Sequence, residues 1–229
     1  MSESQEIFSK IYDTAYWGNG SGDGSDPKKV KVYINLIEDF IKKNNVKSIV
    51  DFGCGDWQFS NLINFNDAEY LGIDLVDSVI DSNNRKYSKK NIKFSRFKAY
   101  REIPKADLLL VKDVLQHLPR EEVKKIIDQL FINYKFVIVT NCISPFNKLG
   151  NLIINYFSNK GIYNRKIKFG EFTYFDIRKY PYNLNGKCLL TWKYSKKKKK
   201  GISLILDFLK KLILGKDCLW KKNIILIKN

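Results

Sequence analysis

The residues best suited to chemistry in this chain are acids and glycines that directly follow an apolar run. Residues 49–57 read Ile-Val-Asp-Phe-Gly-Cys-Gly-Asp-Trp, so two glycines alternate between two carboxylates. Gly53 and Gly55 carry no Cβ, and backbone amides in such a loop can approach a ligand closely. A strand, a glycine loop and a helix build a nucleotide-type pocket at the carboxyl end of a parallel sheet, where the helix N-terminus adds positive potential. We therefore expect residues 49–57 to hold a nucleotide-like cofactor.

The spacing within this loop distinguishes among cofactors. A dinucleotide fingerprint is G-x-G-x-x-G, and Gln58 stands here in place of its third glycine. Asp51 and Asp56 would repel a pyrophosphate but suit the sulfonium and amino groups of S-adenosylmethionine. Asp74 ends a second apolar run, where a carboxylate can accept both ribose hydroxyls. These residues favour S-adenosylmethionine over a nicotinamide or flavin cofactor.

Alternating apolar runs and helical patterns indicate the elements that position these residues. Short strands are expected at 48–52, 69–74, 92–95, 107–112 and 135–140, and again at 187–194 and 223–228 after a loop-rich segment at 160–185. Helices are expected at 3–14, from Asp26-Pro27 to about Asn44, from Trp57 to Asn64, after Asp74 to about Tyr87, at 120–131 and at 149–157. Continuous apolar strands between helices indicate a parallel sheet covered on both faces.

Several segments resemble the motifs of class I S-adenosylmethionine-dependent methyltransferases. Val-Asp-Phe-Gly-Cys-Gly-Asp-Trp (50–57) resembles the first motif, Leu-Gly-Ile-Asp-Leu (71–75) the second, and Ala-Asp-Leu-Leu-Leu-Val-Lys-Asp-Val-Leu-Gln-His-Leu (106–118) the fourth. Ser-Gly-Asp-Gly-Ser (21–25) and Gly-Glu-Phe-Thr-Tyr-Phe-Asp-Ile-Arg-Lys-Tyr-Pro-Tyr (170–182) resemble a subgroup of small methyltransferases found among glycan-synthesis enzymes. The resemblance implies a Rossmann-like class I methyltransferase fold, in which a seven-stranded, mostly parallel sheet has helices on both faces and an antiparallel last strand.

The resemblance also assigns cofactor contacts residue by residue. The glycine loop would surround the methionine end, the acid after the second strand would hold the ribose, and the end of the fourth strand would line the pocket. The family usually has an acid after the third strand, but this chain has Phe-Ser-Arg-Phe-Lys-Ala (94–99), so an aromatic ring is expected to stack on the adenine. The expected cofactor-binding residues are Asp51, Gly53, Cys54, Gly55, Asp56, Trp57, Asp74, Leu75, Phe97, Lys112 and Val114.

His117 is the candidate general base. An imidazole with a pKa near 6.5 can take a proton from a hydroxyl, and the alternative is a histidine that only packs or hydrogen-bonds. Asp113 is the second candidate catalytic residue, since it could orient His117 or act itself, with a cofactor or capping role as the alternative. Tyr16, Trp17 and Arg178 are expected to contact substrate, and the Gly/Ser loop 18–25 to act as a lid.

No metal is expected. Asp113 and Asn141 both follow strand ends, but two oxygen ligands alone make a poor magnesium site. His117 is the only histidine, and Cys54, Cys142 and Cys188 lie far apart, as does Cys218, which fits a reducing cytoplasm. The polar N-terminus does not read as a secretory signal, and no run of about 20 apolar residues predicts a membrane span.

The net charge of +17 leaves several partners open. It suits nucleic acid, an anionic membrane or a phosphorylated substrate, or is simply a lysine-rich surface. Five lysines at 196–200 precede the apolar segment 202–214, so a basic amphipathic helix is expected at 196–216. Its residues 196–214 would lie on an anionic membrane surface or pack on the domain.

We predict four parts in the chain: N-terminal helices and lid (1–45), an S-adenosylmethionine-binding core (46–195), the inserted basic helix (196–216) and the last strand (217–229). The predicted function is O-methylation of a sugar, glycan or glycolipid, in the cytoplasm or peripherally at a membrane. RNA methylation and a non-catalytic cofactor-binding subunit that anchors a partner are the alternatives. Nucleic acid ranks lower as a partner because no RNA-binding appendage is recognisable.

Overall fold

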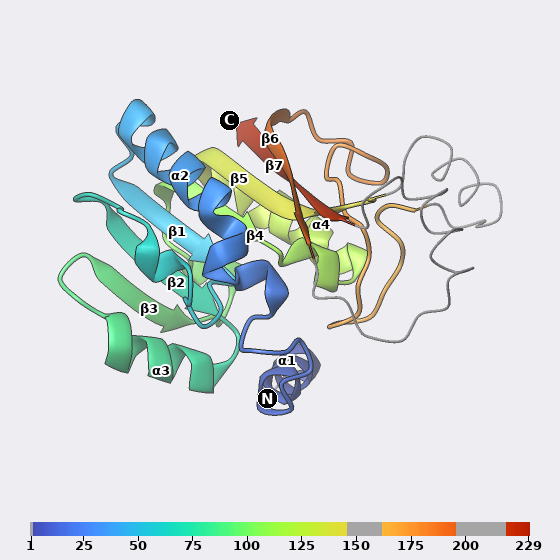
Figure 1. Cartoon of the computed structure of the whole chain (residues 1–229), viewed down its shortest axis with the longest axis horizontal. Helices are drawn as coiled ribbons and strands as arrows, with labels where there is room; N and C mark the ends of the chain where they lie inside the picture. The colour runs from blue at the N-terminus through green and yellow to red at the C-terminus, as the bar shows by residue number, and fades with distance from the viewer. Residues whose placement is uncertain (1, 146–161, 196–218) are drawn as a thin grey trace.

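The computed structural model describes residues 2–145, 162–195 and 219–229, and within them seven strands form one sheet (Figure 1). The strand order is β3-β2-β1-β4-β5-β7-β6. β7 runs antiparallel to both of its neighbours, and the other paired strands are parallel. This confirms the predicted sheet with one antiparallel last strand. The strands are β1 (Ser48–Phe52), β2 (Glu69–Asp74), β3 (Ile92–Arg96), β4 (Ala106–Lys112), β5 (Tyr134–Ile143), β6 (Lys187–Ser195) and β7 (Leu219–Lys228).

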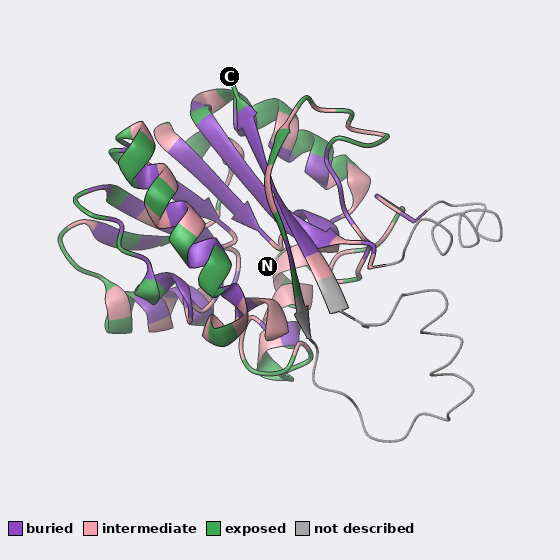
Figure 2. Ribbon diagram, turned by 45° about the horizontal axis from the view of Figure 1, so that its top comes forward, coloured by how far each residue is buried: buried purple, intermediate pink, exposed green. Residues whose placement is uncertain are grey.

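Helices cover both faces of the sheet, as predicted. α2 (Pro27–Asn44) and α3 (Asp77–Tyr87) bury apolar side chains in the cluster on one face, and α4 (Arg120–Gln129) does so on the other. α1 (Glu3–Asp13) stands apart from these layers, beyond the ends to which the arrows of β1 and β3 point in Figure 1. Figure 2 shows the central strands almost entirely buried, because the apolar runs that form them have both faces covered.

Local signals set the ends of α2 where the sequence predicts them. The Asp26 carboxylate accepts a hydrogen bond from the Lys28 backbone N–H at 3.0 Å, and Pro27 occupies the first helical position. The helix ends at Asn45, whose left-handed backbone (φ 49°) satisfies the last carbonyls.

The prediction of a helix from Trp57 to Asn64 is wrong. Only a single 3-10 turn forms, at Ser60–Leu62. Trp57 has φ +57°, which no right-handed helix accommodates, and the Asn61 side chain bonds to the carbonyls of Trp57 and Gln58. No helix N-terminus therefore follows the glycine loop, and the positive potential expected from one is not available there.

The other expected elements occur with small boundary shifts. β5 extends to Ile143 because it pairs with β7 as far as Lys221, and β7 begins at Leu219 because it pairs there with Ser195 of β6. The helices expected at 149–157 and 196–216 lie outside the described residues. Among the described residues, no helix is long and apolar enough to cross a bilayer.

Candidate active site

A cavity lies at the carboxyl ends of β1, β2 and β4, and α1 and the loop after it form its outer wall. It has a volume of about 150 Å³ and opens to solvent. The predicted residues that line it are Trp17, Asp51, Gly53, Cys54, Gly55, Asp74, Leu75, Phe97, Lys112, Asp113, Val114 and His117.

The glycine loop needs its glycines for both backbone and packing reasons. Gly53 has φ +76° and Gly55 has φ +58°, conformations that residues with a side chain rarely adopt. A Cβ at Gly53 would collide with the Val114 side chain, and one at Gly55 with the Ser21 hydroxyl. The loop is anchored to β2, because the Gly53 and Cys54 N–H groups both donate to the Ile73 carbonyl at 2.8 and 3.1 Å.

Two carboxylates flank this loop, that of buried Asp51 and that of partly buried Asp74. The Tyr70 hydroxyl donates to Asp51 Oδ2 at 2.7 Å, and burial raises the pKa of Asp51 to about 6 although that bond and Lys112 act in the opposite direction. Asp74 accepts from the N–H groups of Gly55 (2.9 Å) and Val76 (3.1 Å), and burial raises its pKa as well. Since burial penalises their negative charge, a cationic ligand in the cavity would stabilise the ionised carboxylates.

Asp56 does not line the cavity but holds the Gly/Ser loop on the glycine loop. Ser21 Oγ donates to Asp56 Oδ1 at 2.7 Å, the Ser21 N–H donates to Oδ2 at 3.2 Å, and the Asp56 N–H donates back to Ser21 Oγ at 3.1 Å. Tyr12 Oη lies 2.8 Å from the same hydroxyl. We call this set of contacts the Ser21–Asp56 latch. It places Ser21 and Ser25 in the cavity wall, where the sequence predicts a lid.

Trp57 is also absent from the cavity lining and lies in the core behind it, with 4% of its surface exposed. Its indole packs against Phe65 and Phe94, with ring centroids at 6.2 and 5.2 Å. Its Nε1–H donates to the Tyr70 hydroxyl at 2.8 Å, and that hydroxyl in turn donates to Asp51. In this structure Trp57 therefore acts on the site through Tyr70 rather than by lining it.

Aromatic rings form the end of the cavity beyond Asp74. Phe97 lies edge-on to Phe52 with centroids 5.6 Å apart, and 5.0 Å from the Tyr100 ring. The Phe97 N–H donates to the Asp74 carbonyl at 2.8 Å, which ties this aromatic end to β2. Leu75 lines the same cavity, so this end suits a flat, apolar group. Phe52 and Tyr100 are additions to the predicted set, and Phe52 stands within the loop motif itself.

Asp113 lies between two buried ammonium groups. Lys112 Nζ is 2.7 Å from Asp113 Oδ2, and Lys222 Nζ bonds the same oxygen. Burial opposes ionisation, but the two lysines outweigh it and lower the pKa of Asp113 to about 2. Its Oδ1 is buried and has no hydrogen-bond partner among the described residues. Asp113 is thus a strong hydrogen-bond acceptor and a weak base. Lys222 was not predicted, because a lysine within a strand pattern suggests a solvent-exposed position.

His117 lies on the 3-10 turn Leu115–His117 after β4 and faces the cavity. Its ring is 4.9 Å from the Trp17 ring and 5.9 Å from the Phe172 ring, centroid to centroid. Nδ1 lies 2.9 Å from the Glu171 carbonyl oxygen, and burial lowers the pKa of His117. The imidazole is therefore neutral at pH 7 and able to accept a proton.

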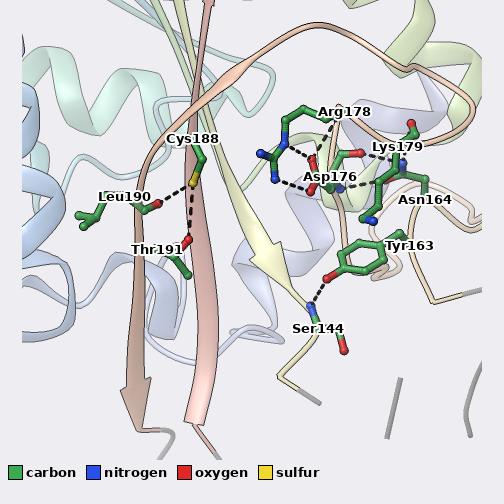
Figure 3. A network of polar contacts seen from close by, with 9 residues as sticks. All are labelled: Ser144, Tyr163, Asn164, Asp176, Arg178, Lys179, Cys188, Leu190 and Thr191. Carbon is green, nitrogen blue, oxygen red and sulfur yellow. Dashed lines mark hydrogen bonds and ion pairs between the residues drawn. The ribbon is translucent and has the colours of Figure 1, made fainter. Parts of the chain in front are cut away.

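Two predicted substrate residues lie elsewhere. Tyr16 is 74% exposed and does not line the cavity. Figure 3 shows the Arg178 guanidinium turned toward Asp176, to which Nε and Nη2 donate at 2.9 and 2.8 Å. Contact of either residue with a substrate stays a prediction. No group of three or more His, Cys, Asp or Glu side chains in the described part of the chain is arranged to hold a metal ion.

Comparison with solved structures gives close agreement in topology at low sequence identity. ChlM, the magnesium protoporphyrin IX methyltransferase of Synechocystis PCC 6803 solved with bound SAH, matches with TM-score 0.56 and 15% identity, over 99% of this chain and 100% of that one. A SAM-dependent methyltransferase from Anabaena variabilis matches with TM-score 0.59 and 13% identity, over 100% of this chain and 96% of that one. The fold is that of the class I methyltransferases.

TehB from Haemophilus influenzae matches in the same way, with TM-score 0.55 and 15% identity over 99% of this chain and 67% of that one. No protein-family model matches this chain, and no curated protein matches it either.

Proposed function

We propose that the protein is an S-adenosylmethionine-dependent methyltransferase that methylates an oxygen of a sugar, glycan or glycolipid. The observation that carries the proposal is one cavity with two kinds of wall. Buried Asp51 and partly buried Asp74 flank a glycine loop on one side, and a neutral histidine near two aromatic rings stands on the other.

The cofactor side fits S-adenosylmethionine, which would supply a methyl group on a positively charged sulfur. Asp51 would face the cationic methionine end, because its carboxylate is buried and the nearby Lys112 only partly offsets the effect of burial on its pKa. Gly53 and Gly55 line the cavity and would bring backbone groups close to the cofactor. Asp74 would bind the ribose hydroxyls, and Leu75 and Phe97 would pack on the adenine.

The acceptor side suits a hydroxyl carried by a ring. His117 would accept the hydroxyl proton as the new bond to oxygen forms, and Asp113 Oδ1, which has no hydrogen-bond partner in the described part of the chain, would orient a donor beside it. Trp17 lines the cavity beside His117 and would offer an aromatic ring against which the C–H groups of a sugar can pack. Alignment of the two reactants in this cavity would supply most of the rate enhancement.

The direct test of this function is a cofactor titration followed by methyl transfer to a panel of acceptors. S-adenosylhomocysteine should bind with an affinity measurable by calorimetry, and His117→Ala should retain that affinity while losing about 10²-fold or more in turnover. Gln129→Ala, at the exposed end of α4, is the matched control. Unchanged turnover in His117→Ala would exclude the base, and no binding would exclude the methyltransferase itself.

The net charge of +17 is the observation that favours RNA as a second candidate acceptor. If RNA is the acceptor, the protein should bind RNA with an affinity that falls steeply as the salt concentration rises.

The predicted contact of residues 196–214 with an anionic membrane is a separate proposal, and these residues lie outside the described part of the chain. Sedimentation with anionic vesicles, with and without residues 196–214, tests it.

A further inference from the structure

Gln116 is a buried polar residue that the function above leaves without a role. It adjoins His117 on the same 3-10 turn and is only 4% exposed. The backbone N–H of Cys142 on β5 donates to Gln116 Oε1 at 2.7 Å. Because an N–H can only donate, this bond fixes which end of the carboxamide is the oxygen, and the NH₂ end must point the other way.

The NH₂ end of Gln116 meets the histidine ring. Gln116 Nε2 lies 3.3 Å from His117 Nε2, and His117 Nδ1 lies 2.9 Å from the Glu171 carbonyl oxygen. A carbonyl only accepts, so Nδ1 carries the hydrogen, while an amide NH₂ only donates, so Nε2 must offer its lone pair. Two independent partners thus require the same state of the ring, the neutral tautomer protonated on Nδ1.

The surrounding backbone prevents an easy exchange of these roles. If the Gln116 side chain flipped, its NH₂ would face the Cys142 N–H and the buried bond would be lost. The turn is also held from the other side, since Thr173 N–H donates to the Gln116 carbonyl (3.1 Å) and Gly170 N–H to the His117 carbonyl (2.9 Å). Glu171 lies between these two anchors in the sequence, so both bonds help to hold its carbonyl oxygen against the His117 ring.

We propose that Gln116 is a positioning residue that holds His117 in the Nδ1–H tautomer, with the Nε2 lone pair directed for proton acceptance. The catalytic value of this arrangement rests on the proposed function. At 3.3 Å the amide contact is long for a hydrogen bond, so the hydroxyl of an acceptor can displace it. In the reaction the O–H bond of the acceptor breaks and an N–H bond forms at Nε2.

The experiment uses the fact that His117 is the only histidine in the chain. In a ¹⁵N long-range NMR spectrum of the full protein, every imidazole signal belongs to His117. The wild type should show a protonated Nδ1 and an unprotonated Nε2, with a titration midpoint below 6.5. A wild-type ring protonated on Nε2 instead would overturn the proposal, whether or not any variant folds.

Gln116→Glu is the decisive variant. Its carboxylate can still accept from the Cys142 N–H, but toward His117 it becomes an acceptor and draws a proton onto Nε2. The titration midpoint should rise by one unit or more, about a tenfold gain in proton affinity. Gln129→Glu adds the same charge at the exposed end of α4 and should leave the midpoint unchanged. A midpoint that does not move in Gln116→Glu would refute the role of Gln116.

Methyl transfer distinguishes this proposal from the function on which it rests. Gln116→Glu should lose turnover near neutral pH while its affinity for S-adenosylhomocysteine stays unchanged, because a larger fraction of the His117 rings is then protonated and cannot accept the proton. If the spectra change as expected but turnover does not, Gln116 still positions the ring and His117 is not the base. The proposed function then fails at its catalytic residue, independently of the inference about Gln116.

Discussion

The affinity of the cavity for its cofactor should depend on pH through Asp51. Burial raises the pKa of this carboxyl to about 6 in the unliganded protein. A cationic ligand favours the ionised form, so binding should return the pKa toward its ordinary value of 3.8. The direction of the effect is therefore fixed: between these two values, protons leave the protein when the ligand binds, and acid weakens binding.

The magnitude follows from the fraction of Asp51 that is ionised. With a pKa of about 6, about nine-tenths of the carboxyl is ionised at pH 7 and about one-tenth at pH 5. The dissociation constant of S-adenosylmethionine should accordingly rise about tenfold between pH 7 and pH 5. Near pH 6 about half a proton should be released per ligand bound, which calorimetry in buffers of different ionisation enthalpy measures.

Two variants make the test specific. Asp51→Asn keeps an oxygen that accepts from the Tyr70 hydroxyl but cannot ionise, so its affinity should be low and nearly independent of pH. Asp74→Asn should retain the pH dependence, because the ribose that it would contact is uncharged. A flat profile in the wild type, or the wild-type slope in Asp51→Asn, would refute the assignment of Asp51 to the cationic end of the ligand.

The apo protein should show the opposite trend in stability. Because folding raises the pKa of Asp51, this group stabilises the folded state at pH values below 3.8 and loses that contribution as the pH rises through about 6. Ligand-induced stabilisation therefore grows over the same interval in which the intrinsic contribution of Asp51 declines.

Two further changes test the supports of the site. Trp57→Ala removes a buried indole that packs on Phe65 and Phe94. It should lower the free energy of unfolding, measured by urea titration, by about 3–5 kcal/mol. A loss below about 1 kcal/mol would contradict the core position of Trp57. Ser21→Ala removes the hydroxyl of the Ser21–Asp56 latch. At about 1 kcal/mol for the lost hydrogen bonds, it should weaken cofactor binding about fivefold and change the free energy of unfolding little. An unaltered dissociation constant would show that the latch does not support the cavity.

The sheet and most of the cofactor wall were predictable from the sequence for one physical reason. Each apolar run long enough for a buried strand ends at or next to the acid that it presents, so β1, β2 and β4 carry Asp51, Asp74 and Asp113 to one edge. A residue next to the end of a strand must lie at the same edge of the sheet as that end. The local sequence pattern is therefore enough to predict where these residues lie.

The remaining residues depend on contacts that local pattern does not contain. Trp57 takes a left-handed backbone because its ring is buried against α3 and the strands, which overrides a helical pattern after it. Lys222 reaches Asp113 only because β7 inserts between β5 and β6, with Cys142 opposite Lys222. Gln116 acquires its partners from β5 and from the segment after residue 162, both distant in sequence.

The Ser21–Asp56 latch has a consequence for the kinetics of exchange. Phe8, Tyr12 and Trp17 line the cavity from residues that precede the first strand, and they are joined to one another by ring contacts. A bound cofactor would lie behind this N-terminal arm, and opening of the latch would widen its route to solvent. We therefore expect undocking of residues 2–25 to shorten the residence time of the cofactor, so that the arm would affect the rate of turnover as well as line the cavity.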